Sequence, residues 1–133
     1  MRILVVDDHP ILRQALAALL REEPDIEIAG EASDGEMAIV RTRELRPDAI
    51  LMDVQMPGMD GIQATRAIHG EFPDACIVAL SAFEDGDTMT RMRDAGAYSY
   101  VVKGDSMDSC LQALRDCVRI VHNRPPADRR AAA

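Results

Sequence analysis

The stretch Ala49-Ile50-Leu51-Met52-Asp53 is a short apolar run that ends in a carboxylate. Apolar runs of this length between turn residues are typical of the strands of a buried parallel sheet. The pattern recurs along the chain, where residues 3–6 lead into Asp7 and Asp8, residues 77–80 into Ser81, and residues 100–102 into Lys103. Ligands of an open parallel sheet bind at the carboxyl ends of its strands, so we expect these polar side chains to meet at one edge.

Segments with apolar residues at helical spacing alternate with these strands. Pro10 opens the first helix. Ser33 and Glu36 form the capping box of a second helix, which stops before Pro47. Further helices are expected at about residues 60–70, 87–95 and 106–121. The fourth helix has a thin apolar face of Met89, Met92 and Ala95, which predicts low local stability. Residues 26–28 alternate in polarity, as an edge strand does. The order βαβαβαβαβα predicts a doubly wound α/β sheet with helices on both faces.

The composition is that of one globular domain. The chain has 133 residues, of which 47% are hydrophobic and 29% charged, and no stretch suited to a membrane span or a signal peptide. The net charge of −8 argues against nucleic-acid binding by this chain alone, because phosphate contacts need a basic face. The three cysteines, Cys76, Cys110 and Cys117, lack CxxC spacing and predict reduced thiols in a cytoplasm.

The polar residues at the strand ends have a shared chemistry. Asp7, Asp8 and Asp53 would repel one another at a common edge unless a counter-charge were present, and Mg²⁺ is the natural choice. A carboxylate at such a metal can attack phosphorus and form an aspartyl-phosphate, with Lys103 and Ser81 stabilising the developing charge. Each residue alone has a simpler role, as a helix cap, a turn residue or a solvated charge. Their combination at four strand ends favours a site.

Three segments carry a resemblance to a known family. Residues 5–10 (VVDDHP), 52–61 (MDVQMPGMDG) and 96–103 (GAYSYVVK) resemble the receiver domain of bacterial two-component response regulators. The resemblance covers about residues 2–121, and DDHP together with residues 29–35 (AGEASDG) resembles the NarL/FixJ class with LuxR-type output. It implies a flavodoxin-like fold, with five helices around a five-stranded parallel sheet of order 2-1-3-4-5.

The resemblance also implies roles for the acidic residues. A sensor histidine kinase would transfer a phosphoryl group to Asp53, the phosphoacceptor, with Lys103 and Ser81 assisting. Asp8 and Asp53 would bind Mg²⁺ directly, Gln55 would bind it through its backbone carbonyl, and Asp7 would act through water. The only catalysis implied is self-phosphorylation and autodephosphorylation of Asp53.

The same resemblance implies a conformational switch formed by Ser81 and Tyr100. The hydroxyl group would move to the phosphoryl group, and the aromatic ring would turn inward.

Two positions of this chain bear on how closely it follows the family pattern. Many receivers have a cis proline after the lysine, whereas this chain has Gly104, which leaves the isomer of the Lys103–Gly104 bond open. Phe83 stands two residues after Ser81, where an apolar ring could limit the approach of water.

Other functions fit the residues less well. A phosphatase with an aspartate nucleophile on a similar sheet would carry D-x-D-x-T after the first strand, and DDHP does not match. A flavin carrier would need a Ser/Thr/Gly-rich phosphate loop at that position. His9, His69 and His122 are expected to have ordinary helix-opening or surface roles, not to carry phosphohistidine.

The C-terminal residues bear on the domain organisation. Residues 1–122 are expected to form the receiver, and residues 123–133 a linker or tail in which Ala131-Ala132-Ala133 could be a cloning scar. The favoured interpretation is a cytoplasmic receiver from a longer transcriptional regulator, whose missing helix-turn-helix domain would bind DNA. The alternative is a stand-alone receiver that acts through protein contacts. A homodimer is also possible through the apolar faces of the first, fourth and fifth helices.

Overall fold

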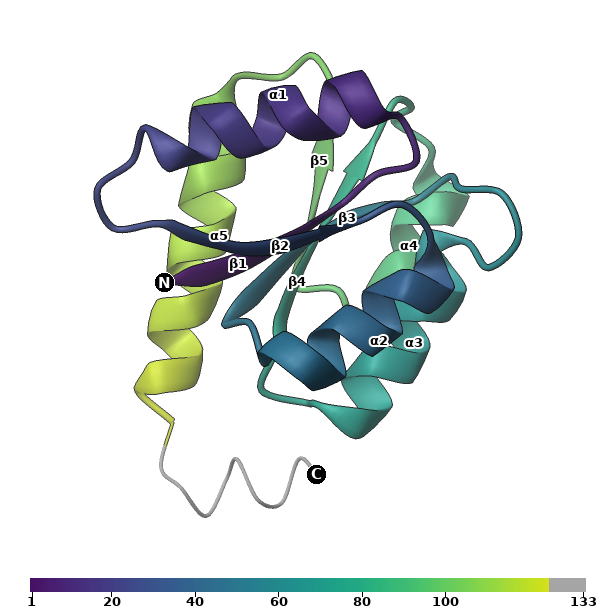
Figure 1. Cartoon of the computed structure of the whole chain (residues 1–133). Helices are drawn as coiled ribbons and strands as arrows, with labels where there is room; N and C mark the ends of the chain where they lie inside the picture. Colours follow the sequence, from purple (N-terminus) through teal and green to yellow (C-terminus); the bar gives the residue numbers. More distant parts are fainter. Residues whose placement is uncertain (125–133) are drawn as a thin grey trace.

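A five-stranded parallel sheet with helices on both faces forms the core of the computed structural model, which describes residues 1–124 (Figure 1). In chain order the elements are β1 (Arg2–Val6), α1 (Pro10–Arg21), β2 (Glu27–Ala32), α2 (Gly35–Leu45), β3 (Ala49–Asp53), α3 (Gly61–Glu71), β4 (Cys76–Ser81), α4 (Gly86–Ala95), β5 (Ser99–Val102) and α5 (Met107–His122). The strand order is β2-β1-β3-β4-β5, as expected from the sequence. The expected edge strand is confirmed as β2, which lies at one edge of the sheet and begins at Glu27, one residue later than expected.

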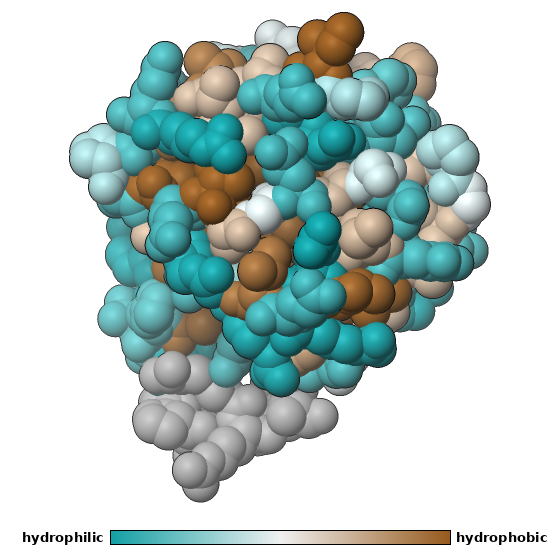
Figure 2. Space-filling model, in the orientation of Figure 1, coloured by the Kyte–Doolittle hydropathy of each residue, from teal (hydrophilic) through white to brown (hydrophobic). Residues whose placement is uncertain are grey.

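The sheet separates two hydrophobic clusters. One lies under α2, α3 and α4 and includes the buried Ile68 and Met92. The other lies under α1 and α5 and includes Leu20 and Leu114. The central strands β1, β3 and β4 are buried along almost their whole length, because both of their faces are covered by helices. Seen in the orientation of Figure 1, the surface is mainly hydrophilic, and hydrophobic residues lie in separate areas (Figure 2).

The strand register brings the predicted polar residues together. Val6 of β1 pairs with Met52 of β3, so the residues that follow them, Asp7 and Asp53, end neighbouring strands side by side. Ser81 of β4 pairs with Val102 of β5, which places Lys103 beside the end of β4. The carboxyl edge of the sheet is therefore the edge with the candidate chemistry.

One local prediction is corrected by the structure. The N-cap of α2 is Asp34, whose side chain accepts a hydrogen bond of 2.7 Å from the Met37 N–H, and not Ser33. Asp and Ser are about equally good caps, so the sequence could not choose between adjacent residues. The fourth helix lies where it was expected, over Gly86–Ala95, and of its thin apolar face only Met92 and Ala95 are buried.

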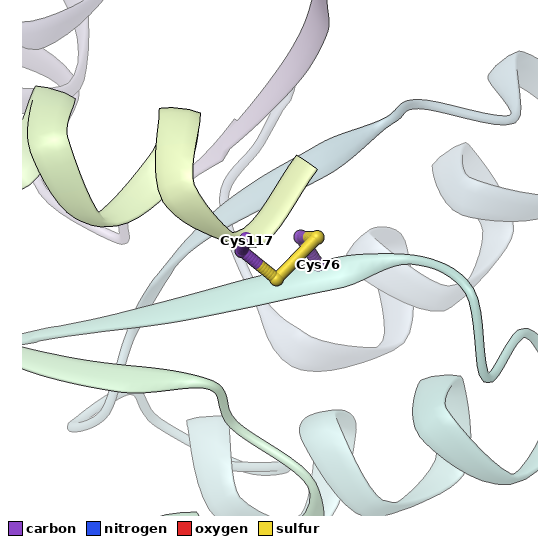
Figure 3. Close-up of a disulfide and its surroundings, with 2 residues drawn as sticks. All are labelled: Cys76 and Cys117. Carbon is purple, nitrogen blue, oxygen red and sulfur yellow. A yellow bond between two sulfur atoms is a disulfide. The ribbon is translucent and has the colours of Figure 1, made fainter. Parts of the chain in front are cut away.

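The prediction of three reduced thiols is wrong for two of them. Cys76, the first residue of β4, forms a disulfide with Cys117 of α5, and their Cα atoms are 5.9 Å apart (Figure 3). The two residues are 41 positions apart in the sequence, and they meet because α5 packs against β4. Cys110 is free, as predicted, and it is buried.

Candidate metal centre

Four side chains converge at the carboxyl edge of the sheet. Asp7, Asp8, His9 and Asp53 each offer one potential ligand atom, and these atoms all lie within 4.8 Å of one another. Asp7 and Asp53 are almost fully buried, with exposed fractions of 0% and 2%, whereas Asp8 is only partly buried. The predicted acidic cluster is therefore formed by the fold.

Lys103 provides the positive charge that faces this cluster. Its Nζ atom lies 3.2 Å from Asp7 Oδ2 and 3.3 Å from Asp53 Oδ1. The backbone fixes this position, since the Lys103 N–H donates a hydrogen bond of 2.6 Å to the Ser81 carbonyl. Every peptide bond within residues 1–124 is trans, including the bond from Lys103 to Gly104.

Asp53 is ionised with difficulty in this environment. Burial is the main cause, and the neighbouring Asp7 carboxylate adds to it, so that the pKa of Asp53 rises to about 6 despite the opposing effect of Lys103. One lysine thus compensates the acidic pair only in part. A further positive charge at the cluster would favour the carboxylate form of Asp53.

The donor atoms suit a divalent cation. Within the described part of the chain, Asp7 Oδ2, Asp8 Oδ1 and Asp53 Oδ2 are buried oxygens without a hydrogen bond, although Lys103 Nζ faces the first and His9 Nδ1 the second at 3.2 Å. A buried carboxylate oxygen without a hydrogen bond is costly, and three hard oxygen donors in one cluster match the preferences of Mg²⁺. The Gln55 N–H lies 3.4 Å from Asp53 Oδ1, which keeps the loop after β3 close to the cluster.

A glycine at the start of α3 allows this helix to pack closely against the backbone of Asp53. A Cβ atom built on Gly61, the first residue of α3, would lie 2.2 Å from the Asp53 carbonyl oxygen. The Gly61 N–H also donates a hydrogen bond of 2.8 Å to the Val54 carbonyl. The start of α3 therefore packs directly on the backbone that carries Asp53, and a larger residue would have to displace it.

The predicted switch residues meet in the loop after β4. Ser81 is 1% exposed, and its Oγ accepts a hydrogen bond of 3.3 Å from the Phe83 N–H. The Tyr100 hydroxyl group donates a hydrogen bond of 2.8 Å to the Phe83 carbonyl. Both side chains thus hold the backbone of Phe83, a residue that is itself 59% exposed.

His9 is a member of the site that sequence reasoning missed. It is the N-cap of α1, as its position before Pro10 suggested, but its side chain makes no capping hydrogen bond. The ring turns to the acidic pair instead, with Nδ1 3.3 Å from Asp7 Oδ1 and 3.2 Å from Asp8 Oδ1. The signal was its place directly after two aspartates at a strand end.

Fold and site together define a flavodoxin-like protein with a buried acidic cluster at the carboxyl edge of its sheet. The sequence matches the response regulator receiver domain family over residues 3–115. The chain belongs to this family, the receiver domains of two-component response regulators, and the proposed alternatives of phosphatase and flavin carrier are not favoured. Receiver domains bind Mg²⁺ at an acidic pocket, and the cluster described above has that character.

Named relatives refine the class. The chain is 46% identical over 114 residues to the transcriptional regulatory protein LiaR of Bacillus subtilis, covering 86% of this chain and 54% of LiaR. It is 40% identical to the response regulator GacA of Pseudomonas viridiflava, covering 86% of this chain and 53% of GacA. The chain thus spans about half the length of these relatives, and they are NarL/LuxR-type regulators, in agreement with the predicted class.

Solved structures agree with this assignment. A LuxR-family two-component response regulator from Aurantimonas sp. SI85-9A1 superposes with a TM-score of 0.85 at 33% identity, covering 89% of this chain and 84% of the other. The receiver domain of the putative response regulator NarL from Mycobacterium tuberculosis superposes with a TM-score of 0.84 at 29% identity. The match covers 89% of this chain and 95% of the other. No helix within residues 1–124 is long and apolar enough to cross a membrane.

Proposed function

We propose that this chain accepts a phosphoryl group from a sensor histidine kinase on Asp53. The observation that carries the proposal is the environment of this carboxylate, which is buried, lies beside Asp7 and contacts Lys103, yet retains one oxygen, Oδ2, without a hydrogen bond. In the transfer, an Asp53 oxygen bonds to phosphorus while the bond from phosphorus to the kinase histidine breaks. The product is an aspartyl-phosphate on Asp53.

The neighbouring residues have distinct roles in this proposal. Asp8 and Asp53 would hold Mg²⁺ directly, Gln55 would hold it through its backbone carbonyl, and Asp7 would act through water. When bound, the cation supplies positive charge that offsets the acidic cluster and the incoming phosphoryl oxygens. Lys103, held between two carboxylates, adds a fixed charge, and the Ser81 hydroxyl adds a hydrogen bond to the phosphoryl group.

Labelling by a small phosphodonor tests the assignment of Asp53. With Mg²⁺ present, we expect one phosphoryl group per wild-type chain and none in Asp53→Asn, because the amide removes the nucleophilic oxygen. Mass spectrometry after borohydride trapping should place the adduct on Asp53. Asp94→Asn, which changes an exposed carboxylate on α4, is the matched control and should label normally. Full labelling of Asp53→Asn would exclude this phosphoacceptor, and repeated phosphate release would favour a phosphatase.

Metal titration tests the roles of the three aspartates. We expect Asp8→Asn and Asp53→Asn to weaken Mg²⁺ binding at least tenfold, and Asp7→Asn to weaken it less, because a direct ligand contributes more than one acting through water. Isothermal titration calorimetry on the metal-free variants gives the three affinities. An Asp7→Asn variant that loses as much affinity as the other two would contradict the assigned roles.

The consequences of phosphorylation concern Ser81, Tyr100 and the output. We propose that the Ser81 hydroxyl leaves the Phe83 N–H for the phosphoryl group, which frees the loop and lets Tyr100 and the weakly anchored α4 change state. The proposed receiver, residues 1–122, would then act on a C-terminal helix-turn-helix domain that binds DNA. Residues 125–133 of the predicted linker lie outside the described residues.

Contacts between chains are a second route for the output. The candidate surfaces of a homodimer include exposed apolar side chains on α1 and α5, namely Ile11, Leu19 and Ile120. We place this activity in the cytoplasm. Disulfides are rare there, so the bond between Cys76 and Cys117 does not support the placement, and its occupancy in cells tests it.

A further inference from the structure

The ring of His9 is placed as a ligand would be, not as a cap. Its Nδ1 lies 3.2 Å from Asp8 Oδ1 and 3.3 Å from Asp7 Oδ1. Ligands about 2.1 Å from a cation and at right angles to one another are about 3.0 Å apart. The distance from Nδ1 to Asp8 Oδ1 therefore matches neighbouring positions around a single octahedral ion, and the whole donor set, including Asp53, spans no more than 4.8 Å.

The backbone of this segment holds the ring in place. The His9 N–H donates a hydrogen bond of 2.8 Å to Asp7 Oδ1, and the following Pro10 fixes the direction in which α1 begins. The His9 side chain is 68% exposed, so when an ion is bound Nε2 can carry the ring proton in contact with water and leave the Nδ1 lone pair to the ion. The cluster also contains the buried Asp53 Oδ2, which has no hydrogen bond. An ion bound there would meet the Asp8 and Asp53 carboxylates and the His9 nitrogen directly, with Asp7 acting through water.

We propose that His9 Nδ1 is a metal ligand and sets the metal preference of the site. The inference rests on the proposed metal-dependent function and goes beyond it, since that function requires only oxygen ligands. Imidazole nitrogen suits borderline ions such as Co²⁺, Ni²⁺ and Zn²⁺, whereas Mg²⁺ prefers oxygen and keeps several waters. His9 should therefore add affinity for the borderline ions and little for Mg²⁺. A site with this residue distinguishes between metals in a way that an all-oxygen cluster does not.

Parallel titrations of the metal-free protein with Co²⁺ and Mg²⁺ test this role. We expect His9→Ala to bind Co²⁺ at least tenfold more weakly and to change its Mg²⁺ affinity less than threefold. The visible absorption of bound Co²⁺ should also be weaker in this variant. His9→Asn, which keeps a good N-cap residue and an oxygen donor, should show the same loss of Co²⁺ affinity. His122→Gln removes an exposed imidazole at the end of α5 and should bind both ions like the wild type.

The outcomes separate this inference from the proposed function. Unchanged Co²⁺ affinity in both His9 variants, with Mg²⁺ binding and Asp53 labelling intact, would overturn the inference alone. An equal loss for both metals would also overturn it, because His9 would then act by positioning the aspartates and not as a nitrogen donor. A wild-type protein that binds neither ion would overturn the inference and the metal-dependent function together.

Discussion

Asp53→Asn should make the metal-free protein more stable at neutral pH than the wild type. The pKa of Asp53 is raised from 3.8 to about 6, chiefly by burial, so the folded protein disfavours the charged form that the unfolded chain adopts readily. A shift of this size corresponds to about 3 kcal/mol of unfolding free energy. An uncharged asparagine of nearly the same shape avoids that penalty.

The direction of the pH dependence follows from the same shift. Below the unfolded-state pKa of 3.8, Asp53 is protonated in both states and contributes no difference. Between about pH 4 and pH 6 the folded protein keeps a proton that the unfolded chain has lost, so wild-type stability falls as the pH rises. The advantage of Asp53→Asn should therefore appear across this interval and be complete above it.

Urea unfolding of both proteins in a chelator, at several pH values from 4 to 8, measures this difference. Asp94→Asn, which changes an exposed carboxylate of α4, should follow the wild-type profile. Adding Mg²⁺ should stabilise the wild type and leave Asp53→Asn nearly unchanged, because binding to the folded state alone adds stability. Parallel pH profiles for wild type and Asp53→Asn would show that Asp53 ionises without strain in the folded protein.

The same residues show why the fold could be predicted from the sequence. The apolar runs before Asp7, Asp53 and Ser81 are buried on both faces, and continuous hydrophobicity is what two covering layers of helices require. Strand ends then converge by the geometry of a parallel sheet. The sequence could thus place Asp7, Asp53 and Lys103 at one edge without any knowledge of side-chain contacts.

Features that depend on the relative position of distant elements could not be predicted in this way. Cys76 and Cys117 meet because α5 packs against β4, and nothing in their spacing signals a separation of 5.9 Å between Cα atoms. The orientation of the His9 ring depends on a side-chain torsion, which residue patterns do not report. Hydrophobic periodicity determines which face is buried and leaves these choices to tertiary packing.

Reduction of the Cys76–Cys117 disulfide should lower the stability of the protein by about 4 kcal/mol. A crosslink between residues 41 positions apart restricts the unfolded chain, and the loop-entropy relation for that separation gives about this value. The melting temperature should fall by roughly 10–20 °C. Thermal unfolding followed by circular dichroism, with and without a dithiol reductant, measures the effect in the wild type.

The three cysteines provide their own controls for this measurement. Cys110→Ala removes the buried free thiol and should retain the full response to reductant. Burial raises the pKa of this thiol to about 11. The double variant Cys76→Ala/Cys117→Ala should show no response, because it has no bond to reduce. Alkylation of the denatured wild type should modify one cysteine before reduction and all three after it. Equal melting temperatures of the oxidised and reduced wild type would mean that packing alone fixes α5 on β4.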